Sequence, residues 1–311
     1  MHDEKNKSPR KNSAIIVTGG DARYYPLLRD LIDSIRARQE GKDFPVGVLD
    51  GGLETEQVAE FRSQGIHVVK PDWPSDKTRK RAGARQYIVI NLNKPRLDKW
   101  FPDYETLIWL DGDTWVQTWE GIRLFRQVAE KNKLAVVTKT SRLRPKVMRM
   151  SPRPFGWVRP RGFLYNNAKR AKLPTRIRRS LVNKSVFNAG AYAISKHSPH
   201  WERWRFWQNI CMQRGRLFSS DQLSLALTVY EDNLPYEALP DICNYMGPWR
   251  VNRTDGMLLD YFAPYQPASI VHMAGNITPK TLAGESIWAV DENDNAIEAY
   301  LGYCPRKNRI K

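Results

Sequence analysis

The chain has 311 residues, 41% of them hydrophobic, and a formal net charge of +17 at pH 7. This length and apolar content suffice for a sizeable core, so we expect disorder only at the ends. No stretch approaches 18 consecutive apolar residues, which argues against a membrane-spanning helix.

The ends and the cysteines indicate the cellular compartment. Residues 1–12 are charged and polar without an apolar segment, so they predict a loose tail and not a secretory signal. The three cysteines, Cys211, Cys243 and Cys304, are odd in number and lack metal-ligand spacing, which favours unpaired thiols in a reducing compartment. We therefore expect a cytoplasmic protein in which Cys211 and Cys243 fill core space.

The first part of the chain alternates apolar strands with helices. Residues 14–20 form an apolar run that ends in a glycine turn, and residues 25–36 carry leucine and isoleucine at helical spacing. A second strand is expected at residues 45–49, a helix at 55–64 and a strand at 66–69. This alternation predicts an α/β fold with a mostly parallel sheet, which binds ligands at the carboxyl ends of its strands.

The rest of the chain continues the pattern with one interruption. A basic, helix-like stretch covers residues 77–92, and a Pro/Arg-rich region at 144–174 is expected to interrupt regular structure. Further strands are expected at residues 107–110, 134–137 and 186–194, and helices at 201–214 and 221–229. We divide the chain into a tail (1–12), a first half (13–140), a basic insertion (141–184) and a second half (185–311).

Two carboxylates follow the apolar strand at residues 107–110. The period-2 geometry of a strand sends Asp111 and Asp113 to the same side, and Gly112 between them allows close approach. Two hard oxygen ligands make a site for Mg²⁺ or Mn²⁺ that keeps positions open for phosphate oxygens. The pattern favours a nucleotide-sugar transferase, although Asp-Gly-Asp is also ordinary turn chemistry.

The positive charge is concentrated in one segment. No Asp or Glu occurs from residue 131 to residue 201, and residues 142–184 hold fourteen Lys or Arg interleaved with aromatic residues and prolines. Such a segment attracts polyanions, namely nucleic acid, anionic lipid headgroups or a phosphorylated glycan. The alternative is a solvated basic face that only aids solubility.

Five short motifs occur in order along the chain. They are the strand that ends in Asp111 and Asp113, Phe187-Asn-Ala-Gly190, Asp221-Gln222, Leu239-Pro-Asp-Ile-Cys-Asn244, and His272-Met-Ala-Gly275. In this order they resemble the motifs of the retaining glycosyltransferases of family 8. That family includes glycogenins and bacterial lipopolysaccharide galactosyl- and glucosyltransferases, and it has the GT-A fold.

The resemblance assigns roles to these motifs. It implies that His272 is the third metal ligand beside Asp111 and Asp113, and that Asp221 binds sugar hydroxyls while Gln222 lies near the anomeric carbon. It also places Asn188, Gly190 and Gly275 at the donor. The residues alone leave alternatives open: a hydrogen-bonded core histidine for His272, a helix-dipole partner for Asp221, and a backbone-bonding side chain for Asn188.

The first glycine turn is where a GT-A fold holds the base and ribose of the donor. Thr18, Asp21 and Tyr24 lie there. An aspartate can accept the imide N–H of uracil and a tyrosine can stack on the ring, although a plain turn explains the same residues.

Basic residues for the diphosphate are less well defined. Arg85, Lys94 and Arg96 compete for one such role. The family pattern also has a lysine in x-x-K-P-W after its H-x-x-G. Here Lys280 is displaced by two positions and the tryptophan is missing, so Lys280 is a displaced phosphate ligand.

The resemblance implies transfer of a hexose from a UDP-sugar to a glycan or lipid-linked glycan, with Mn²⁺ or Mg²⁺ and with retention of configuration. Residues 13–140 are then the nucleotide-sugar-binding half, and residues 185–311 are the acceptor-binding half with the C-terminal segment. An anionic, lipopolysaccharide-like acceptor would suit the basic segment, as would an anionic membrane surface at the inner face of the membrane. The alternative is a polyanion- or nucleic-acid-binding protein that uses residues 142–184. A metal-dependent phosphohydrolase or nuclease would need more clustered ligands. We do not expect nucleic acid as a partner.

Overall fold

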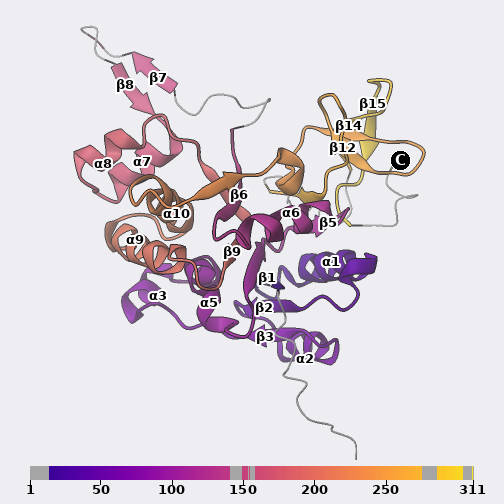
Figure 1. The fold of residues 1–311 in the computed structure, drawn as a ribbon, viewed down its shortest axis with the longest axis horizontal. Coiled ribbons are helices and arrows are strands. Elements are labelled where there is room, and N and C mark those ends of the chain that lie inside the picture. The colour runs from indigo at the N-terminus through magenta and orange to yellow at the C-terminus, as the bar shows by residue number, and fades with distance from the viewer. Residues whose placement is uncertain are drawn as a thin grey trace, which may run out of the picture.

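A seven-stranded sheet forms the centre of the fold (Figure 1), with the strand order β10-β6-β9-β4-β1-β2-β3. The computed structural model describes residues 14–140, 149–152, 154, 158–274, 286–303 and 310. The strands of the central sheet are β1 (Ala14–Gly20), β2 (Val46–Asp50), β3 (His67–Val69), β4 (Thr106–Leu110), β6 (Leu134–Thr138), β9 (Phe187–Ser195) and β10 (Tyr236–Ala238).

Six of the seven strands run in the same direction. β3, β2, β1 and β4 pair in parallel, as do β6 and β10, whereas β9 is antiparallel to both β4 and β6. This confirms the predicted α/β fold with a mostly parallel sheet. Because β9 lies between β4 and β6, segments from both predicted halves of the chain belong to one sheet.

Helices cover both faces of the sheet, which explains the continuous apolar runs of its strands. Ile15 and Val17 of β1 pack into one hydrophobic cluster and Ile16 into another, as the alternation of a strand requires. The Ile16 side is covered by α1 (Tyr25–Arg36), α2 (Thr55–Ser63) and α6 (Glu120–Ala129). The Ile15 side is covered by α4 (Ile88–Asn93), α5 (Leu97–Trp100), α7 (Phe163–Arg170), α8 (Thr175–Ser180), α9 (His200–Arg214) and α10 (Ser220–Tyr230).

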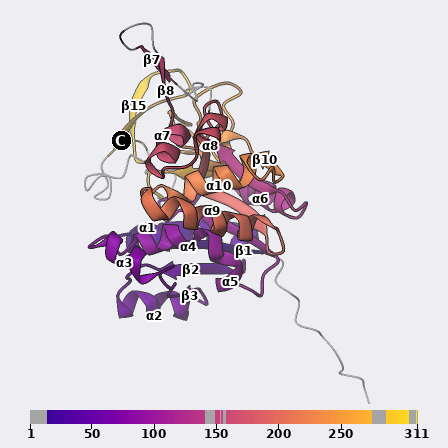
Figure 2. The ribbon, with the colours of Figure 1, turned by 90° about the vertical axis from the view of Figure 1, so that its left-hand side faces the viewer.

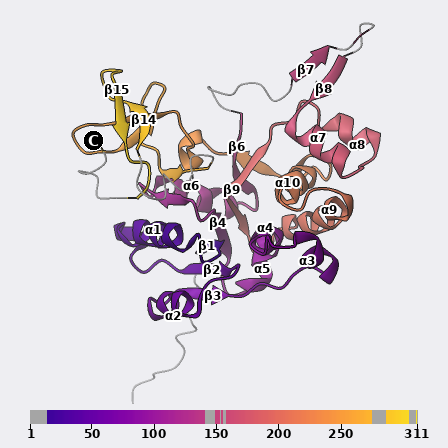
Figure 3. The same ribbon diagram turned by 180° about the vertical axis from the view of Figure 1, so that it is seen from behind.

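Smaller elements extend from this core. Figure 3 shows a four-stranded sheet and a hairpin at opposite ends of the molecule. The small sheet contains β12 (Leu258–Asp260), β11 (Trp249–Val251), β14 (Ile287–Val290) and β15 (Ala296–Ala299), and the hairpin contains β7 (Arg149–Pro152) and β8 (Val158–Arg161). β5 (Thr114–Val116) pairs with β13 (Ile270–His272). The 3-10 turns are η1 (Gln39–Gly41), η2 (Lys94–Arg96) and η4 (Asp241–Asn244).

Two local predictions were wrong. The basic stretch 77–92 is not one helix, because α3 (Asp76–Ala82) ends at Gly83, whose positive φ of 57° stops it before α4. The Pro/Arg-rich region is not without regular structure, since its described part contains the β7–β8 hairpin and α7. Its apolar residues Leu164 and Ala168 lie four apart and are buried in the core, which explains the helix there.

Two further observations concern the compartment predictions. Cys211 and Cys243 are buried free thiols, as expected, while Cys304 lies outside the described residues. Within the described part of the chain, no helix is long and apolar enough to cross a membrane.

Candidate active site

The carboxyl end of β4 is the centre of the candidate site. The chain leaves the strand at Asp111, whose N–H donates to the carbonyl of Gly190, and turns so that the N–H of Thr114 donates back to the carbonyl of Asp111. β5 begins at Thr114 and pairs antiparallel with β13, which sets His272 opposite Thr114. The N–H of Met273 donates to the carbonyl of Asp113. This pairing carries His272 to the two aspartates.

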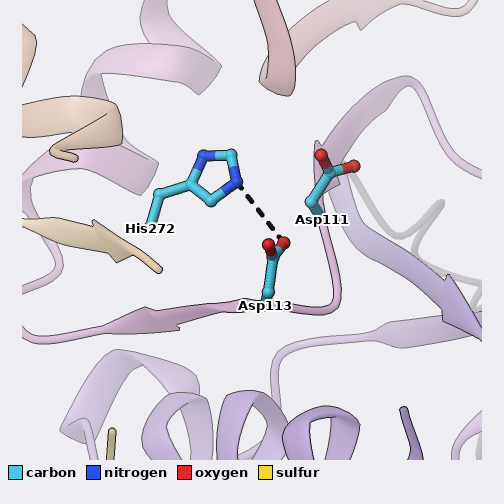
Figure 4. A group of neighbouring side chains, drawn as sticks. All are labelled: Asp111, Asp113 and His272. Atoms are coloured by element: carbon cyan, nitrogen blue, oxygen red, sulfur yellow. Dashed lines mark ion pairs between the residues drawn. The ribbon is translucent and has the colours of Figure 1, made fainter. Parts of the chain in front are cut away.

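Asp111, Asp113 and His272 form a compact group of metal-type ligands (Figure 4). One ligand atom from each residue lies within 4.8 Å of the others, and His272 Nε2 is 3.4 Å from Asp113 Oδ1. Two carboxylates and one imidazole suit Mn²⁺ well and Mg²⁺ acceptably. The three residues that the resemblance assigns to a metal therefore lie together with a suitable donor set.

Asp111 presents only one of its oxygens to this group. Its Oδ1 accepts hydrogen bonds from Lys94 Nζ and Trp109 Nε1, each at 2.7 Å. Burial favours the protonated carboxyl, but the positive charge of Lys94 and the proximity of His272 outweigh it and lower the pKa of Asp111. Asp111 is therefore an ionised carboxylate, and its Oδ2 takes no part in these two hydrogen bonds.

Lys94 connects the metal-type ligands to Asp221. It lies in η2 and is only 3% exposed. Its ammonium donates to the carbonyl of Ala189 at 3.0 Å and lies 3.6 Å from Asp221 Oδ2. Burial acts to lower the pKa of Lys94, but the charges of Asp111 and Asp221 outweigh it and raise the pKa. Lys94 is thus a buried cation shared by two carboxylates.

The other two basic candidates have different surroundings. Arg96 donates to Gln208 Oε1 on α9 at 2.7 Å and to the carbonyl of Leu92. Arg85 is exposed in the turn between α3 and α4. Of the three residues that competed for a phosphate-binding role, Lys94 is the one in contact with Asp111.

Asp221 supplies a buried acceptor at the start of α10. It is 3% exposed, and its Oδ1 accepts no hydrogen bond from the described residues. Burial raises the pKa of Asp221, with Lys94 acting in the opposite direction. An unsatisfied buried oxygen is costly unless a ligand donates to it, so this oxygen suits a sugar hydroxyl. Gln222 is the next residue of the same helix and is half-buried.

The Phe187-Asn-Ala-Gly190 motif lies under the ligand group. A Cβ at Gly190 would lie 2.3 Å from His272 Cε1 and 3.0 Å from Asp111 Oδ2, so the site has no room for a side chain there. Asn188 accepts the N–H of Gly190 at 3.2 Å and donates to Met246 Sδ at 3.4 Å. Its oxygen therefore has the backbone-bonding role that the sequence left open.

The turn after β1 lies beside the same group. Tyr24 approaches the Asp-Gly-Asp turn, because a Cβ at Gly112 would lie 3.6 Å from its Cδ1. Burial, with the charges of Asp113 and Asp111, raises the pKa of Tyr24 to about 12. Asp21 accepts the N–H groups of Arg23 and Tyr24 and pairs with the Arg23 guanidinium at 2.8 Å. Thr18 is fully buried, and its hydroxyl has no partner among the described residues.

Sequence reasoning missed two residues that orient the ligands. Trp109 donates to Asp111, and Asn244 Oδ1 lies 2.7 Å from His272 Nδ1. Asn244 was visible as the last residue of a motif, but nothing in the sequence indicated its partner. The predicted donor residues Gly275 and Lys280 lie outside the described residues.

Comparisons with known proteins place the chain by its fold. No protein-family model matches the chain, and no curated protein matches its sequence. It is similar to the galactosyltransferase LgtC in complex with donor and acceptor sugar analogues, with 16% identity, a TM-score of 0.51, and coverage of 85% of this chain and 88% of that one. It is also similar to the bifunctional glycosyltransferase WbbM, with 18% identity and a TM-score of 0.52 over 87% of this chain. The match spans 47% of WbbM.

These similarities show that the chain has the GT-A fold of glycosyltransferases. A fold of this kind hosts different chemistries, and the function of a protein depends on the residues of its site.

Proposed function

We propose that the protein is a metal-dependent glycosyltransferase that moves a hexose from a UDP-sugar to a glycan or lipid-linked glycan. One observation carries the proposal: Asp111, Asp113 and His272 converge at the carboxyl end of a central strand of a GT-A fold. Ligands of open α/β sheets bind at such strand ends. Lys94 and Asp221 adjoin this group, since the Lys94 ammonium lies 2.7 Å from Asp111 Oδ1 and 3.6 Å from Asp221 Oδ2.

The three ligands would hold Mn²⁺ or Mg²⁺, and the ion would offset the negative charge that develops on the departing diphosphate. Lys94 keeps Asp111 ionised for this role. The free Oδ1 of Asp221 would accept a sugar hydroxyl and orient the ring, and Gln222 would lie near the anomeric carbon.

Retention of configuration is the stereochemical part of the proposal. Support for it comes from the resemblance of the five motifs to those of the retaining transferases of family 8. That resemblance implies that the acceptor hydroxyl attacks on the side from which the diphosphate departs. A phosphate oxygen then takes the hydroxyl proton.

The nucleotide part of the donor would lie against the β1 turn. Tyr24 is 37% exposed and close to Gly112, so its ring is available to a base or ribose. The unpartnered hydroxyl of Thr18 is a second polar group at this end of β1. Asp21 would have to exchange its pairing with Arg23 for a bond to the imide of uracil.

We propose that the acceptor is anionic and resembles lipopolysaccharide. Support comes from the basic insertion, whose described helices α7 and α8 carry exposed lysines and arginines and no acidic residue. The same charge supports the alternative of a polyanion-binding protein. That alternative gives no role to Lys94, the buried lysine shared by Asp111 and Asp221. Removing these three charges from water costs free energy.

A donor panel tests the proposal. Purified protein would be incubated with Mn²⁺ and UDP-, GDP- and CMP-sugars without acceptor, and released nucleotide would be measured. We expect slow hydrolysis of one UDP-sugar, abolished by EDTA and by Asp113→Asn. Asp103→Asn is the matched control, because Asp103 is exposed and outside the site. Release that persists in EDTA and in Asp113→Asn would refute metal-dependent transfer.

A further inference from the structure

The structure joins the basic insertion to basic residues from other parts of the chain. Figure 2 shows α3, α9, α10, α7 and α8 on one side of the molecule. Exposed lysines and arginines occur on or directly after four of these helices, and we call them the basic belt: Lys77, Arg79, Lys80, Arg81, Lys169, Arg170, Lys172, Arg176, Arg179, Arg214 and Arg216.

Contacts between neighbouring elements show that the parts of the belt adjoin. The guanidinium of Arg81, on α3, donates to the carbonyl of Gly215 at 2.8 Å, just beyond the end of α9. A Cβ at Gly215 would lie 3.2 Å from the Cβ of Ala171, which follows α7. The end of α9 therefore connects α3 to α7, and Arg214 and Arg216 flank that junction. Arg176, at the far end, is the belt residue with an acidic partner, Glu231 at 3.2 Å.

Aromatic rings are exposed along the same side. Phe218 is 57% exposed and Phe163 is 37% exposed. Phe218 lies beside α7, because the hydroxyl of its neighbour Ser219 donates to Asn167 Oδ1 at 3.1 Å. Large apolar side chains are costly in water, so two such rings among cations indicate a surface that meets an apolar partner.

We propose that the basic belt docks on an anionic lipid bilayer. Cations contact the headgroup phosphates of such a surface, while exposed rings enter the boundary of the acyl chains. Sequence-specific binding of a duplex nucleic acid would instead require an element that enters a groove. The belt lies on the sides and ends of helices that are packed against the core. This surface is separate from the metal-type ligands and does not depend on the proposed transfer reaction.

The belt also lies near the candidate active site. Ser219, two residues before Asp221, donates from its hydroxyl to Asn167 Oδ1 on α7 at 3.1 Å. A lipid-linked molecule in the bilayer would therefore approach the site from the α7 end.

Vesicle binding tests the proposal. Protein would be sedimented with vesicles of phosphatidylcholine alone and of phosphatidylcholine mixed with phosphatidylglycerol. We expect binding to the mixed vesicles only. Replacing Lys172, Arg214 and Arg216 with Gln should weaken that binding on the order of a hundredfold at low salt. Phe218→Ser should weaken it by about tenfold at low and high salt alike.

A matched charge control separates the belt from net charge. Lys42, Arg62 and Lys131 are exposed basic residues outside α3, α7, α8 and α9, and replacing them with Gln removes the same charge. This control should change binding less than twofold, because salt screens charges that lie far from the docked surface. Thermal melts verify that each variant folds. Equal losses in both triple variants, or equal binding to both vesicles, would overturn the proposal. Tighter binding of a single-stranded oligonucleotide through the belt would overturn it in favour of nucleic acid.

Discussion

Asn244 Oδ1 lies 2.7 Å from Nδ1 of His272, and this contact determines which imidazole nitrogen faces the two aspartates. An amide oxygen only accepts hydrogen bonds, so Nδ1 must carry the proton. In the neutral imidazole Nε2 then carries the lone pair, and it faces the metal-type group, 3.4 Å from Asp113 Oδ1. Both Asn244 and His272 are buried, so water does not replace the contact. Asn244 is therefore a positioning residue for His272.

The first prediction concerns this contact. Asn244→Leu removes the acceptor, so His272 loses its fixed tautomer, and we expect Mn²⁺ affinity to fall about 10- to 100-fold. Asn244→Asp retains an acceptor oxygen and should retain most of the affinity. Free Mn²⁺ can be followed by electron paramagnetic resonance. A Leu variant that folds and binds Mn²⁺ like the wild type would refute the positioning role.

Gly190→Ala tests the packing beneath the ligands. The new Cβ would lie 2.3 Å from His272 Cε1, so the imidazole must shift. We expect a destabilisation of about 1–3 kcal/mol and a weaker metal site. Gly83→Ala is the control, because its Cβ meets nothing within 4 Å although its φ is +57°. That control should lower stability by about 1–3 kcal/mol through backbone strain without changing Mn²⁺ affinity. Unchanged metal binding in Gly190→Ala would contradict the packing argument.

Lys94→Met tests the shared cation. The variant leaves Asp111 and Asp221 without their positive partner in a buried setting. We expect a loss of about 3–5 kcal/mol in the free energy of unfolding, measured in urea. Lys94→Met combined with Asp221→Asn should recover part of this loss, because one uncompensated charge is removed. The account fails here if the single variant is as stable as the wild type.

His200 predicts a pH dependence of stability. Burial lowers the pKa of His200 to about 4, below its usual value of 6.5. Between these values the unfolded chain binds a proton that the folded chain does not, so stability falls as the pH falls below about 6.5. The loss from about pH 7 to about pH 5 should be about 2 kcal/mol, and below about pH 4 it levels off. His200→Gln should flatten this dependence in urea unfolding at the two pH values. An unchanged slope in the variant would show that other groups cause it.

Much of the fold was predictable because local patterns agree with the tertiary structure. The apolar run before Asp111 and the glycine turn after β1 each indicate a buried strand with a functional end. The helix over residues 25–36 was predicted with the bounds the structure gives it, since its apolar spacing matches one buried face. The two aspartates lie close together as predicted, but the reason is a turn and not the period of a strand, because β4 ends at Leu110 and the N–H of Thr114 donates back to the carbonyl of Asp111.

Relationships between distant segments were not predictable from the sequence. His272 meets Asp113 through the pairing of β5 with β13, which no local pattern encodes. Of Arg85, Lys94 and Arg96, only Lys94 contacts Asp111, because the 3-10 turn η2 buries the Lys94 side chain. Likewise, α3 joins the basic belt through contacts of Arg81 with the end of α9. Such contacts follow from packing, whereas the sequence shows only residue type and order.

The most direct test of the account is a Mn²⁺ titration in the presence of UDP, with bound and free Mn²⁺ distinguished by electron paramagnetic resonance. The wild type and Asp103→Asn should each bind a single Mn²⁺ with the same affinity, because Asp103 is exposed and outside the site. Asp113→Asn should weaken binding at least about tenfold, since one of three ligands loses its charge. A wild-type protein that binds no Mn²⁺, or an Asp113→Asn variant that binds it as tightly as Asp103→Asn, would contradict the assignment of these residues to a metal-dependent transferase.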